Sequence, residues 1–537
     1  MFQITIRATS VIITPGKEAM EPLQPLIQLH VYEDEFQDEV RTLGFLYDEQ
    51  YDRCFLHKGV DINYLRRLLG ECEIKYEKYH PYKEMAFEFE EIFPPKNDDQ
   101  KDCINFIAGE GSHSQNANDS QIFLVKEPGF GKTFCTGYGI GLYGAKALII
   151  MHQDTLRSQW RDSLYNMNGY TSNEVYELTS SAELEQIANG DVKLDYDVYL
   201  MTHATFLAAC NRIHDTNKIG LITRNLQIGI KVIDEAHLHF RNTLMIDFMF
   251  NVRRNLYLTA TDGRSSKDEN AIFRHVFSNT TFYRKQSIAD DTHPSKWVEY
   301  VAVNINTHVN PNIYRYRVNG GRGMSAITYG KWVIAYDKQK RHFKVCRDLL
   351  KEIFANVSTA KVIIFLPLIE LCTECAYFLT MELDNDPTFD YSLMIKTINS
   401  NNTKSENEYN KRADVIVTTI QSIGTGQDIK GVTDIICCSP FVSKITSKQV
   451  FGRIRYINKP CHFYDIVDKS VQADIYWWKS RARTLKSLAT KFTSLTWEED
   501  TDDSSKANTQ SDQVVQATSV RECYERINDR DNRPKHL

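Results

Sequence analysis

The 537-residue sequence lacks an excess of positive charge, because 70 aspartates and glutamates outnumber 64 lysines and arginines. The formal net charge is -6. This balance excludes a protein that coats a polyanion through bulk charge, so any polyanion site must be built locally. Two basic segments, DKQKRHFK and KSRARTLK, could line such a groove or could be ordinary solvated helix ends.

The sequence also lacks an unbroken apolar run long enough to span a membrane, which needs about 20 residues. The longest candidate, Val362 to Leu379, is interrupted by Pro367, Glu370 and Glu374. The start, MFQITIRATS, has no long apolar core of a secretory signal and is typical of a strand. We therefore expect a soluble, intracellular protein with no membrane partner.

A paired-cysteine zinc site is missing as well. Cys372 and Cys375 form one C-x-x-C, but no second pair follows at the spacing of a zinc ribbon. The neighbouring Leu371 and Ala376 indicate a helix packed inward. We expect the twelve cysteines to be reduced, and this pair to be buried rather than metal-bound.

Strand and helix patterns alternate twice along the chain, which predicts two α/β domains with parallel sheets covered by helices on both faces. The first is expected over residues 94–288 and the second over 289–498, with a mobile insertion at about 307–330. Residues 1–93 read as a small α+β accessory domain, either a packing or partner domain or one that grips a substrate. The polar tail, 499–537, is expected to be disordered.

The segment EPGFGKTF, Glu127 to Phe134, follows an apolar strand and predicts a phosphate-binding loop. Its glycines would let backbone N–H groups close around phosphate. Lys132 would supply positive charge to the β- and γ-phosphates, and Thr133 would offer a hydroxyl to Mg²⁺. The strict pattern has glycine where this chain has Lys126. The expected nucleotide-binding residues of the loop are Pro128, Gly129, Phe130, Gly131, Lys132 and Thr133.

A second motif, KVIDEAH, places two acidic residues after an apolar strand, where open α/β sheets bind ligands. Asp234 would hold Mg²⁺ through water, and Glu235 would orient and deprotonate an attacking water. This division of work suits phosphoryl transfer, which depends chiefly on positioning and charge neutralisation.

The ordered motifs GFGKT, DEAH and LTAT, the last at Leu258 to Thr261, resemble those of superfamily 2 helicases and translocases. Further along, VTTIQSIGTGQDI is similar to that family's motif V and QVFGRIRY to its motif VI. The resemblance covers about residues 94–488. Motif V is similar in style to phage UvsW-type branch-migration helicases and, more distantly, to the XPB and RecG branch. It implies two tandem RecA-like domains that bind ATP and Mg²⁺.

The resemblance also implies roles for single residues. Lys132, Glu235, Gln449 and Arg453 would be catalytic, with Arg453 reaching the γ-phosphate. The pattern's second arginine position is Tyr456, so either Arg455 replaces it or the second arginine finger is missing. Adenine would be read by Gln100, and Asp428 would face the nucleotide or an arginine. The implied coupling residues are His237, Thr259 and Thr261, and the implied nucleic-acid contacts are Leu156, Thr202, Thr419, Thr425 and Gly426.

The function implied by the resemblance is that of an ATP hydrolase: a DNA helicase or translocase acting on forked or branched DNA in recombination, repair or replication. Two alternatives stay open, an RNA helicase and an ATP-gated nucleic-acid clamp or scaffold without productive unwinding. The tyrosine in motif VI keeps the second alternative open. The implied setting is the cytoplasm of a bacterium or of a phage-infected host, where a monomer would suffice.

Overall fold

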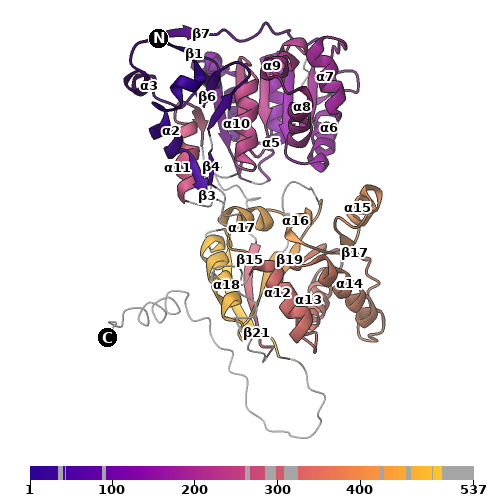
Figure 1. Cartoon of the computed structure of the whole chain (residues 1–537). Coiled ribbons are helices and arrows are strands. Elements are labelled where there is room, and N and C mark those ends of the chain that lie inside the picture. The colour runs from indigo at the N-terminus through magenta and orange to yellow at the C-terminus, as the bar shows by residue number, and fades with distance from the viewer. Residues whose placement is uncertain are drawn as a thin grey trace, which may run out of the picture. The chain divides into compact units, whose positions relative to one another are not determined.

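The computed structural model describes residues 1–33, 40–42, 44–87, 92–127, 129–260, 267–284, 298–307, 325–423, 429–454, 461–486 and 488–498. These residues divide into two compact units, one holding the described residues up to 284 and the other those from 298 onward (Figure 1). None of the helices in the described ranges is both long and apolar enough to cross a membrane.

The first unit contains a seven-stranded sheet whose strands all pair in parallel, in the order β10-β11-β9-β12-β13-β8-β14. The central strands are fully buried and mostly apolar, as expected when helices cover both faces, although they also bury Lys231, Arg254 and Asn255. The strands are β8 (Gln121–Val125), β9 (Ala147–Met151), β10 (Val175–Leu178), β11 (Val198–Thr202), β12 (Ile230–Ile233), β13 (Arg254–Thr259) and β14 (Thr281–Tyr283).

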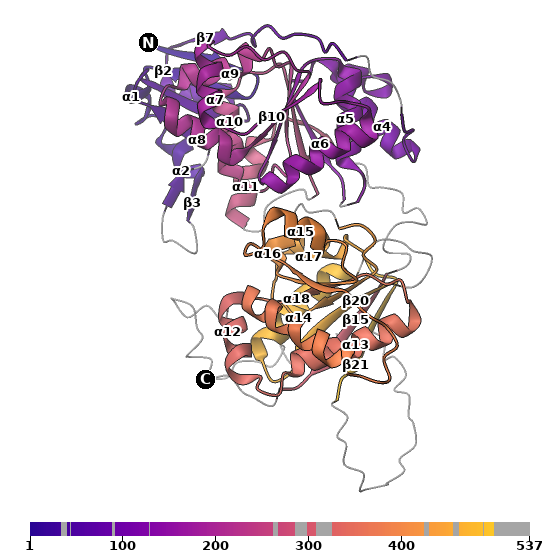
Figure 2. The same cartoon turned by 90° about the vertical axis from the view of Figure 1, so that its right-hand side faces the viewer.

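Helices cover both faces of this sheet, with α4 to α6 on one side and α7 to α10 on the other (Figure 2). The helical elements are α4 (Asp98–Ala108), η1 (Gly111–Asn118), α5 (Lys132–Tyr143), α6 (Asp154–Asn168), α7 (Ser181–Asn189), α8 (His203–Ile213), α9 (Thr216–Asn225), α10 (Phe240–Met249) and α11 (Lys267–Val276).

Helix α5 carries glycines because its neighbours approach its backbone. A Cβ atom on Gly137 would lie 2.3 Å from Oδ1 of Asn168 in α6, and one on Gly139 would lie 2.6 Å from Cγ2 of Ile107 in α4. Glycine costs up to about 1 kcal/mol relative to alanine inside a helix. Close packing against α4 and α6 offsets that cost.

Residues 1–76 form a small mixed sheet, in the order β5-β6-β2-β1-β7, with its own apolar core. Its strands are β1 (Phe2–Ile6), β2 (Ser10–Thr14), β5 (Phe45–Asp48), β6 (Arg53–His57) and β7 (Cys72–Tyr76), with α1 (Gly16–Ala19), α2 (Gln24–Leu29) and α3 (Ile62–Leu69). A separate two-stranded sheet joins β3 (Val31–Glu33) and β4 (Val40–Thr42).

This accessory sheet packs on the first parallel-sheet domain and belongs to the same compact unit. Ile12 and Phe55 take part in that domain's core, where the ring of Phe55 stacks on Phe248 at 5.9 Å. The Ala8 N–H donates to Oδ1 of Asn251 at 3.1 Å. The small N-terminal α+β fold expected from the sequence is therefore present, docked on the α10 side of its neighbour.

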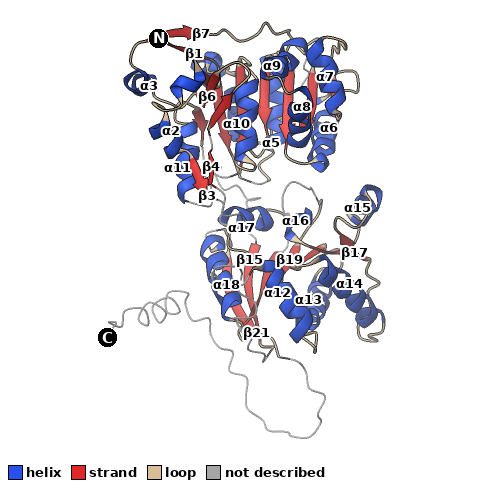
Figure 3. Ribbon diagram, in the orientation of Figure 1, coloured by secondary structure: helices blue, strands red, loops and turns tan. Residues whose placement is uncertain are grey.

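The second unit holds another all-parallel sheet, in the order β17-β18-β16-β19-β20-β15-β21 (Figure 3). Its strands are β15 (Val298–Ile305), β16 (Val362–Phe365), β17 (Ile395–Ile398), β18 (Val415–Thr418), β19 (Asp434–Cys437), β20 (Cys461–Asp468) and β21 (Lys491–Thr496). Its helices are α12 (Ala326–Tyr336), α13 (Arg341–Asn356), α14 (Ile369–Asp384), α15 (Lys404–Asn410), α16 (Ile420–Ile423), α17 (Lys444–Phe451) and α18 (Gln472–Leu485).

The predicted fold class, two tandem parallel-sheet α/β domains with a small N-terminal α+β domain, is confirmed. Cys372 and Cys375 are buried in α14, as their neighbours predict. The predicted C-terminal boundary of the insertion at 307–330 is wrong, because a capping box between Ser325 and Thr328 starts helix α12 before residue 330. Residues 308–324 and the tail 499–537 lie outside the described residues.

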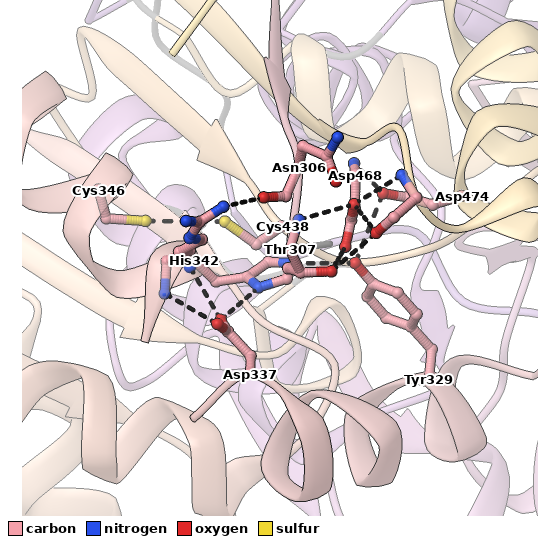
Figure 4. A network of polar contacts seen from close by, with 11 residues as sticks. Asn306, Thr307, Tyr329, Asp337, His342, Cys346, Cys438, Asp468 and Asp474 are labelled. Atoms are coloured by element: carbon pink, nitrogen blue, oxygen red, sulfur yellow. Dashed lines mark hydrogen bonds and ion pairs between the residues drawn. The ribbon is translucent and has the colours of Figure 1, made fainter. Parts of the chain in front are cut away.

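A buried polar network connects α12, α13, β20 and α18 within the second unit (Figure 4). Nδ1 of His342 lies 2.7 Å from Oδ2 of Asp337, and its Nε2 lies 3.0 Å from the hydroxyl of Tyr329. That hydroxyl donates to Oδ2 of Asp474, which also accepts the N–H of Asp468 at 2.8 Å. Burial alone lowers the pKa of His342, but its bond to Asp337 and the nearby carboxylates of Asp468 and Asp474 outweigh burial and raise it.

The Asp337–His342 pair predicts a pH-dependent stability. The pKa of His342 is raised above its ordinary 6.5, so its stabilising effect is complete below pH 6.5 and is lost as pH rises through the raised value. The pKa of Asp337 is lowered from 3.8, because its bond to His342 outweighs burial, so its contribution is lost only in stronger acid. The pair therefore stabilises the fold most between pH 3.8 and pH 6.5.

We expect hydrogen exchange at the start of α13 to be slower at about pH 6 than at about pH 8.5, after correction for intrinsic rates. The variant His342→Gln should remove this difference. An equal pH response in wild type and variant would contradict the assignment.

Candidate nucleotide-binding site

The phosphate-loop candidate lies between β8 and α5. Gly129 and Gly131 have φ angles of 83° and 95°, in the left-handed region that favours glycine. A Cβ on Gly131 would lie 2.8 Å from Nε2 of Gln100, so a larger residue is also sterically excluded. Gly131 directly precedes α5, whose N-terminal N–H groups and dipole suit an anion. Pro128 lies outside the described residues.

Gln100 is buried beneath this loop and supports it. Its Nε2 donates to the carbonyl of Phe130 at 2.6 Å, and its Oε1 accepts the N–H of Lys96 at 2.8 Å. It is 4% exposed. Gln100 therefore braces the loop, and its contact with adenine stays a prediction.

Lys126, which stands where the strict motif has glycine, has a structural role. Its ammonium is 2.6 Å from Oδ2 of Asp99 in α4 and 4.3 Å from the centre of the Phe130 ring. Its backbone carbonyl accepts a hydrogen bond from Nζ of Lys132 at 3.1 Å. The lysine side chain thus fixes the base of the loop, while its carbonyl holds the catalytic candidate Lys132 at the loop.

The two acidic residues follow β12, next to β13 in the sheet. Asp234 accepts hydrogen bonds from Nε1 of Trp160 at 2.8 Å and from the N–H of Glu235 at 2.9 Å. Glu235 has a φ of 48°, an unusual conformation for a residue with a side chain. Such strain is common where a side chain must be aimed at a functional site.

Burial and mutual repulsion separate the acidity of these two carboxyls. Burial, followed by the charge of Glu235, raises the pKa of Asp234. Burial would also raise the pKa of Glu235, but the close contact with His237 and the charge of Lys132 outweigh it and lower the value. Glu235 is therefore the carboxylate that stays ionised most readily.

His237 connects Glu235 to the end of β13. Its Nδ1 lies 3.2 Å from Oε2 of Glu235 and 2.8 Å from the hydroxyl of Thr259, and its ring is fully buried. The carbonyl of Thr259 accepts the N–H of Lys126 at 3.1 Å. The phosphate loop, the acidic pair and two of the predicted coupling residues therefore form one connected network. The third, Thr261, lies outside the described residues.

The predicted nucleic-acid contacts have a different setting. The side chains of Leu156, Thr202 and Thr419 are only 3% to 5% exposed. Leu156 packs in the core, and each threonine hydroxyl accepts a backbone N–H at the start of a helix, from Thr205 and Ser422 respectively. These contacts stabilise the fold, and the contact of the three residues with nucleic acid stays a prediction. Thr425, Gly426 and Asp428 lie outside the described residues.

The motif VI candidates belong to α17 and the turn after it in the second unit. Gln449 is buried in α17, and its Oε1 has no hydrogen-bond partner among the described residues. Arg453 is half-buried just beyond the helix. The roles of both residues in catalysis stay predictions. Arg455 and Tyr456, which decide whether a second arginine finger exists, lie outside the described residues.

Sequence patterns did not assign roles to Trp160 or Asp99. A signal for Trp160 exists, because it lies four residues after Leu156 and so on the same inward face of α6. Nothing in the local sequence marks Asp99 as the partner of Lys126, since the two are joined only by the fold.

Residues 94–264 match the family described as "Type III restriction enzyme, res subunit". A curated relative, transcript termination protein A18 of Yaba monkey tumor virus, is 21% identical over 347 residues, which cover 61% of this chain and 63% of that protein. The chain thus spans less than two thirds of the length of that relative.

Two solved structures show a similar arrangement at low identity. One is S. cerevisiae Dbp5 bound to RNA and ADP BeF3, with a TM-score of 0.47 and 12% identity over 70% of this chain and 86% of that one. The other is the Pyrococcus furiosus Hef helicase domain, with a TM-score of 0.42 and 14% identity over 71% of this chain and 97% of that one. Similarity at this level identifies no substrate.

The family match is limited to residues 94–264 and the curated relative is 21% identical, so neither finding assigns the whole chain to a family. The UvsW, XPB and RecG branch is not confirmed.

The Trp160–Asp234 bond predicts how Mg²⁺ affects ATP hydrolysis by this chain. Trp160→Phe keeps most of the ring packing but removes a hydrogen bond to a carboxylate, worth about 1.5 to 3 kcal/mol. We expect the Mg²⁺ concentration for half-maximal ATP hydrolysis to rise about tenfold. Trp332→Phe is the matched control, because the indole N–H of Trp332 has no partner among the described residues. An unchanged Mg²⁺ requirement in Trp160→Phe would contradict this role.

The Lys126–Asp99 pair predicts non-additive losses in stability. Asp99→Asn alone leaves the buried ammonium of Lys126 without its carboxylate, which costs about 3 to 5 kcal/mol. Adding Lys126→Met removes that charge, so the double variant should unfold at a higher temperature than Asp99→Asn. Thermal unfolding and the affinity for a fluorescent ADP analogue measure both effects. A double variant no more stable than the single one would refute the pairing.

Proposed function

We propose that this chain is an ATP-dependent helicase or translocase that remodels forked or branched DNA. The observation that carries the proposal is the connected network from Lys132 through the Lys126 backbone to Thr259, and from there through His237 to Glu235. In such a network, a change at the γ-phosphate alters contacts at the end of β13. That is the coupling a nucleic-acid motor needs.

ATP would bind at the start of α5. The left-handed glycines let N–H groups approach the phosphates, and the Lys132 ammonium, now bonded to a carbonyl, is the charge available to them. Thr133, one residue into α5, and Asp234, held by Trp160, suit Mg²⁺ because both offer oxygen ligands. Mg²⁺ would supply neutralisation of phosphate charge.

Hydrolysis would use Glu235 as the group that orients and deprotonates water. Its lowered pKa keeps it ionised, and its contact with His237 fixes its direction. The residues Gln449 and Arg453 of the second unit would also act in hydrolysis, as the resemblance of motif VI implies, and an arginine finger contributes about 10³ to 10⁵ in rate. Neither domain would then hydrolyse ATP efficiently alone.

The DNA preference rests on the resemblance of motif V to branch-migration helicases. An RNA helicase and a non-unwinding clamp share the same nucleotide site. Comparison of substrates therefore decides among the three.

The test is ATP hydrolysis without polynucleotide and with single-stranded DNA, duplex, forked DNA, four-way junctions or RNA. We expect the largest stimulation by forks or junctions. Lys132→Ala and Glu235→Gln should each lower turnover at least about 100-fold, as expected for loss of a group that stabilises the transition state. Lys101→Ala, an exposed lysine on α4, is the matched control.

Stimulation by RNA alone would replace the DNA proposal with an RNA helicase. Binding without stimulation by any polynucleotide would indicate a clamp. Undiminished hydrolysis in Lys132→Ala would show that the nucleotide site is elsewhere.

A further inference from the structure

Three histidines from separate segments meet where the accessory sheet packs on the first helicase domain. His30 follows α2, His57 ends β6, and His275 lies in the last turn of α11. Each ring offers one nitrogen, and these nitrogens all lie within 4.8 Å of one another. Among the described residues this is the one group of three or more potential metal ligands with such spacing.

The ring of His30 has a defined tautomer. Its Nδ1 lies 2.6 Å from the carbonyl of Leu26, so Nδ1 carries the proton and donates it. Nε2 of His30 therefore presents a lone pair, and it lies 2.7 Å from Nε2 of His57. A backbone carbonyl that holds the far nitrogen of an imidazole is the usual support of a histidine metal ligand.

Hydrogen bonds within the cluster do not satisfy all of its buried ring nitrogens. If His57 donates from Nε2 to His30, its Nδ1 stays buried without a partner among the described residues. The Nε2 atom of His275 is likewise buried and lacks a partner there. Buried polar atoms of this kind call for an explanation, such as an ion.

The surrounding backbone fixes the rings in place. A Cβ on Gly44 would lie 2.8 Å from Cδ2 of His57 and 3.1 Å from Cδ2 of His30, so the chain packs directly on both rings. A Cβ on Gly59 would lie 2.2 Å from the carbonyl oxygen of His275. The hydroxyl of Ser278 donates to the carbonyl of Gly59 at 3.2 Å, which holds the end of α11 to the loop after β6. The nitrogens are thus brought together by packing from both domains.

The chemistry of the cluster selects a transition metal. Burial disfavours the charged form of an imidazole, and the neutral form is the one that binds metal. Imidazole nitrogens suit Zn²⁺ and its neighbours, whereas Mg²⁺ and Ca²⁺ prefer oxygen. His275 is half-buried and also lines a surface pocket with Lys58 and Asp61, which gives solvent access for a water as fourth ligand.

We propose that His30, His57 and His275 bind one Zn²⁺ ion that fastens the accessory sheet to helix α11. Zn–N distances of about 2.0 to 2.1 Å require the rings of His30 and His57 to separate slightly. The site has a structural role, distinct from the Mg²⁺ of ATP hydrolysis. The bound metal stabilises the folded chain by a free energy that grows with the logarithm of its affinity and concentration.

The test uses the full chain without an affinity tag. After dialysis against metal-free buffer, elemental analysis should find one zinc per chain. Removal of zinc by a chelator should lower the unfolding temperature, and zinc but not Mg²⁺ should restore it. Co²⁺ substitution should give the visible absorption bands of a four-coordinate site with nitrogen ligands.

His275→Ala is the main variant, because its side chain is half-buried and the fold should tolerate its loss. Zinc affinity, measured against a chromophoric chelator, should fall at least about tenfold. His80→Ala is the matched control, since it removes a histidine outside the cluster. Should His275→Ala not fold, the zinc content and the Co²⁺ spectrum of the wild type decide.

Wild-type protein without zinc that also fails to take up Zn²⁺ or Co²⁺ would overturn the proposal. Equal zinc affinity in wild type and His275→Ala would overturn it as well. Neither result depends on ATP hydrolysis, so the proposed motor function is tested separately.

Discussion

The parallel pairing of β8, β13 and β12 is the constraint on which the rest of the site depends. Thr259 pairs with Val125, and Tyr257 pairs with Ile233, so the three strands end at one edge. Segments that are more than a hundred residues apart in sequence thereby place a lysine, two carboxylates and a threonine together. The Lys126 N–H then bonds to the Thr259 carbonyl and links the loop directly to the neighbouring strand. Without that register, the residues of the separate motifs would not lie close together.

The phosphate loop and the acidic pair could be predicted from short sequence patterns, because each depends on residues that are adjacent in the chain. A glycine-bearing turn between an apolar strand and a helix predicts a phosphate-binding loop, and adjacent carboxylates at a strand end are visible in the sequence. The support of Asp234 by Trp160 and the pairing of Lys126 with Asp99 depend on contacts between separate elements, so no local pattern reveals them. The histidine cluster is harder still, because its three members come from three segments and two domains.

The accessory domain also combines features that local sequence patterns reveal with features that only the fold reveals. Its first strand follows from the start of the sequence, MFQITIRATS, but its docking does not, since Ile12 and Phe55 look like ordinary core residues of a small sheet. Only the fold shows that they belong to the core of the neighbouring domain. The predicted nucleic-acid contacts show the opposite effect. Their positions in motifs predict that Thr202 and Thr419 contact nucleic acid. In the structure, their hydroxyls accept backbone N–H groups at the starts of helices.

The glycines of α5 have a mechanical consequence. Where side chains separate two helices, a small displacement can be absorbed by changes of rotamer. At Gly137 and Gly139 the helix has no side chain of its own to adjust, so sliding of α5 against α4 and α6 is limited by the side chains of Ile107 and Asn168 that contact its backbone. On the other side of the phosphate loop, the Lys126 N–H and the Thr259 carbonyl join the loop to the end of β13.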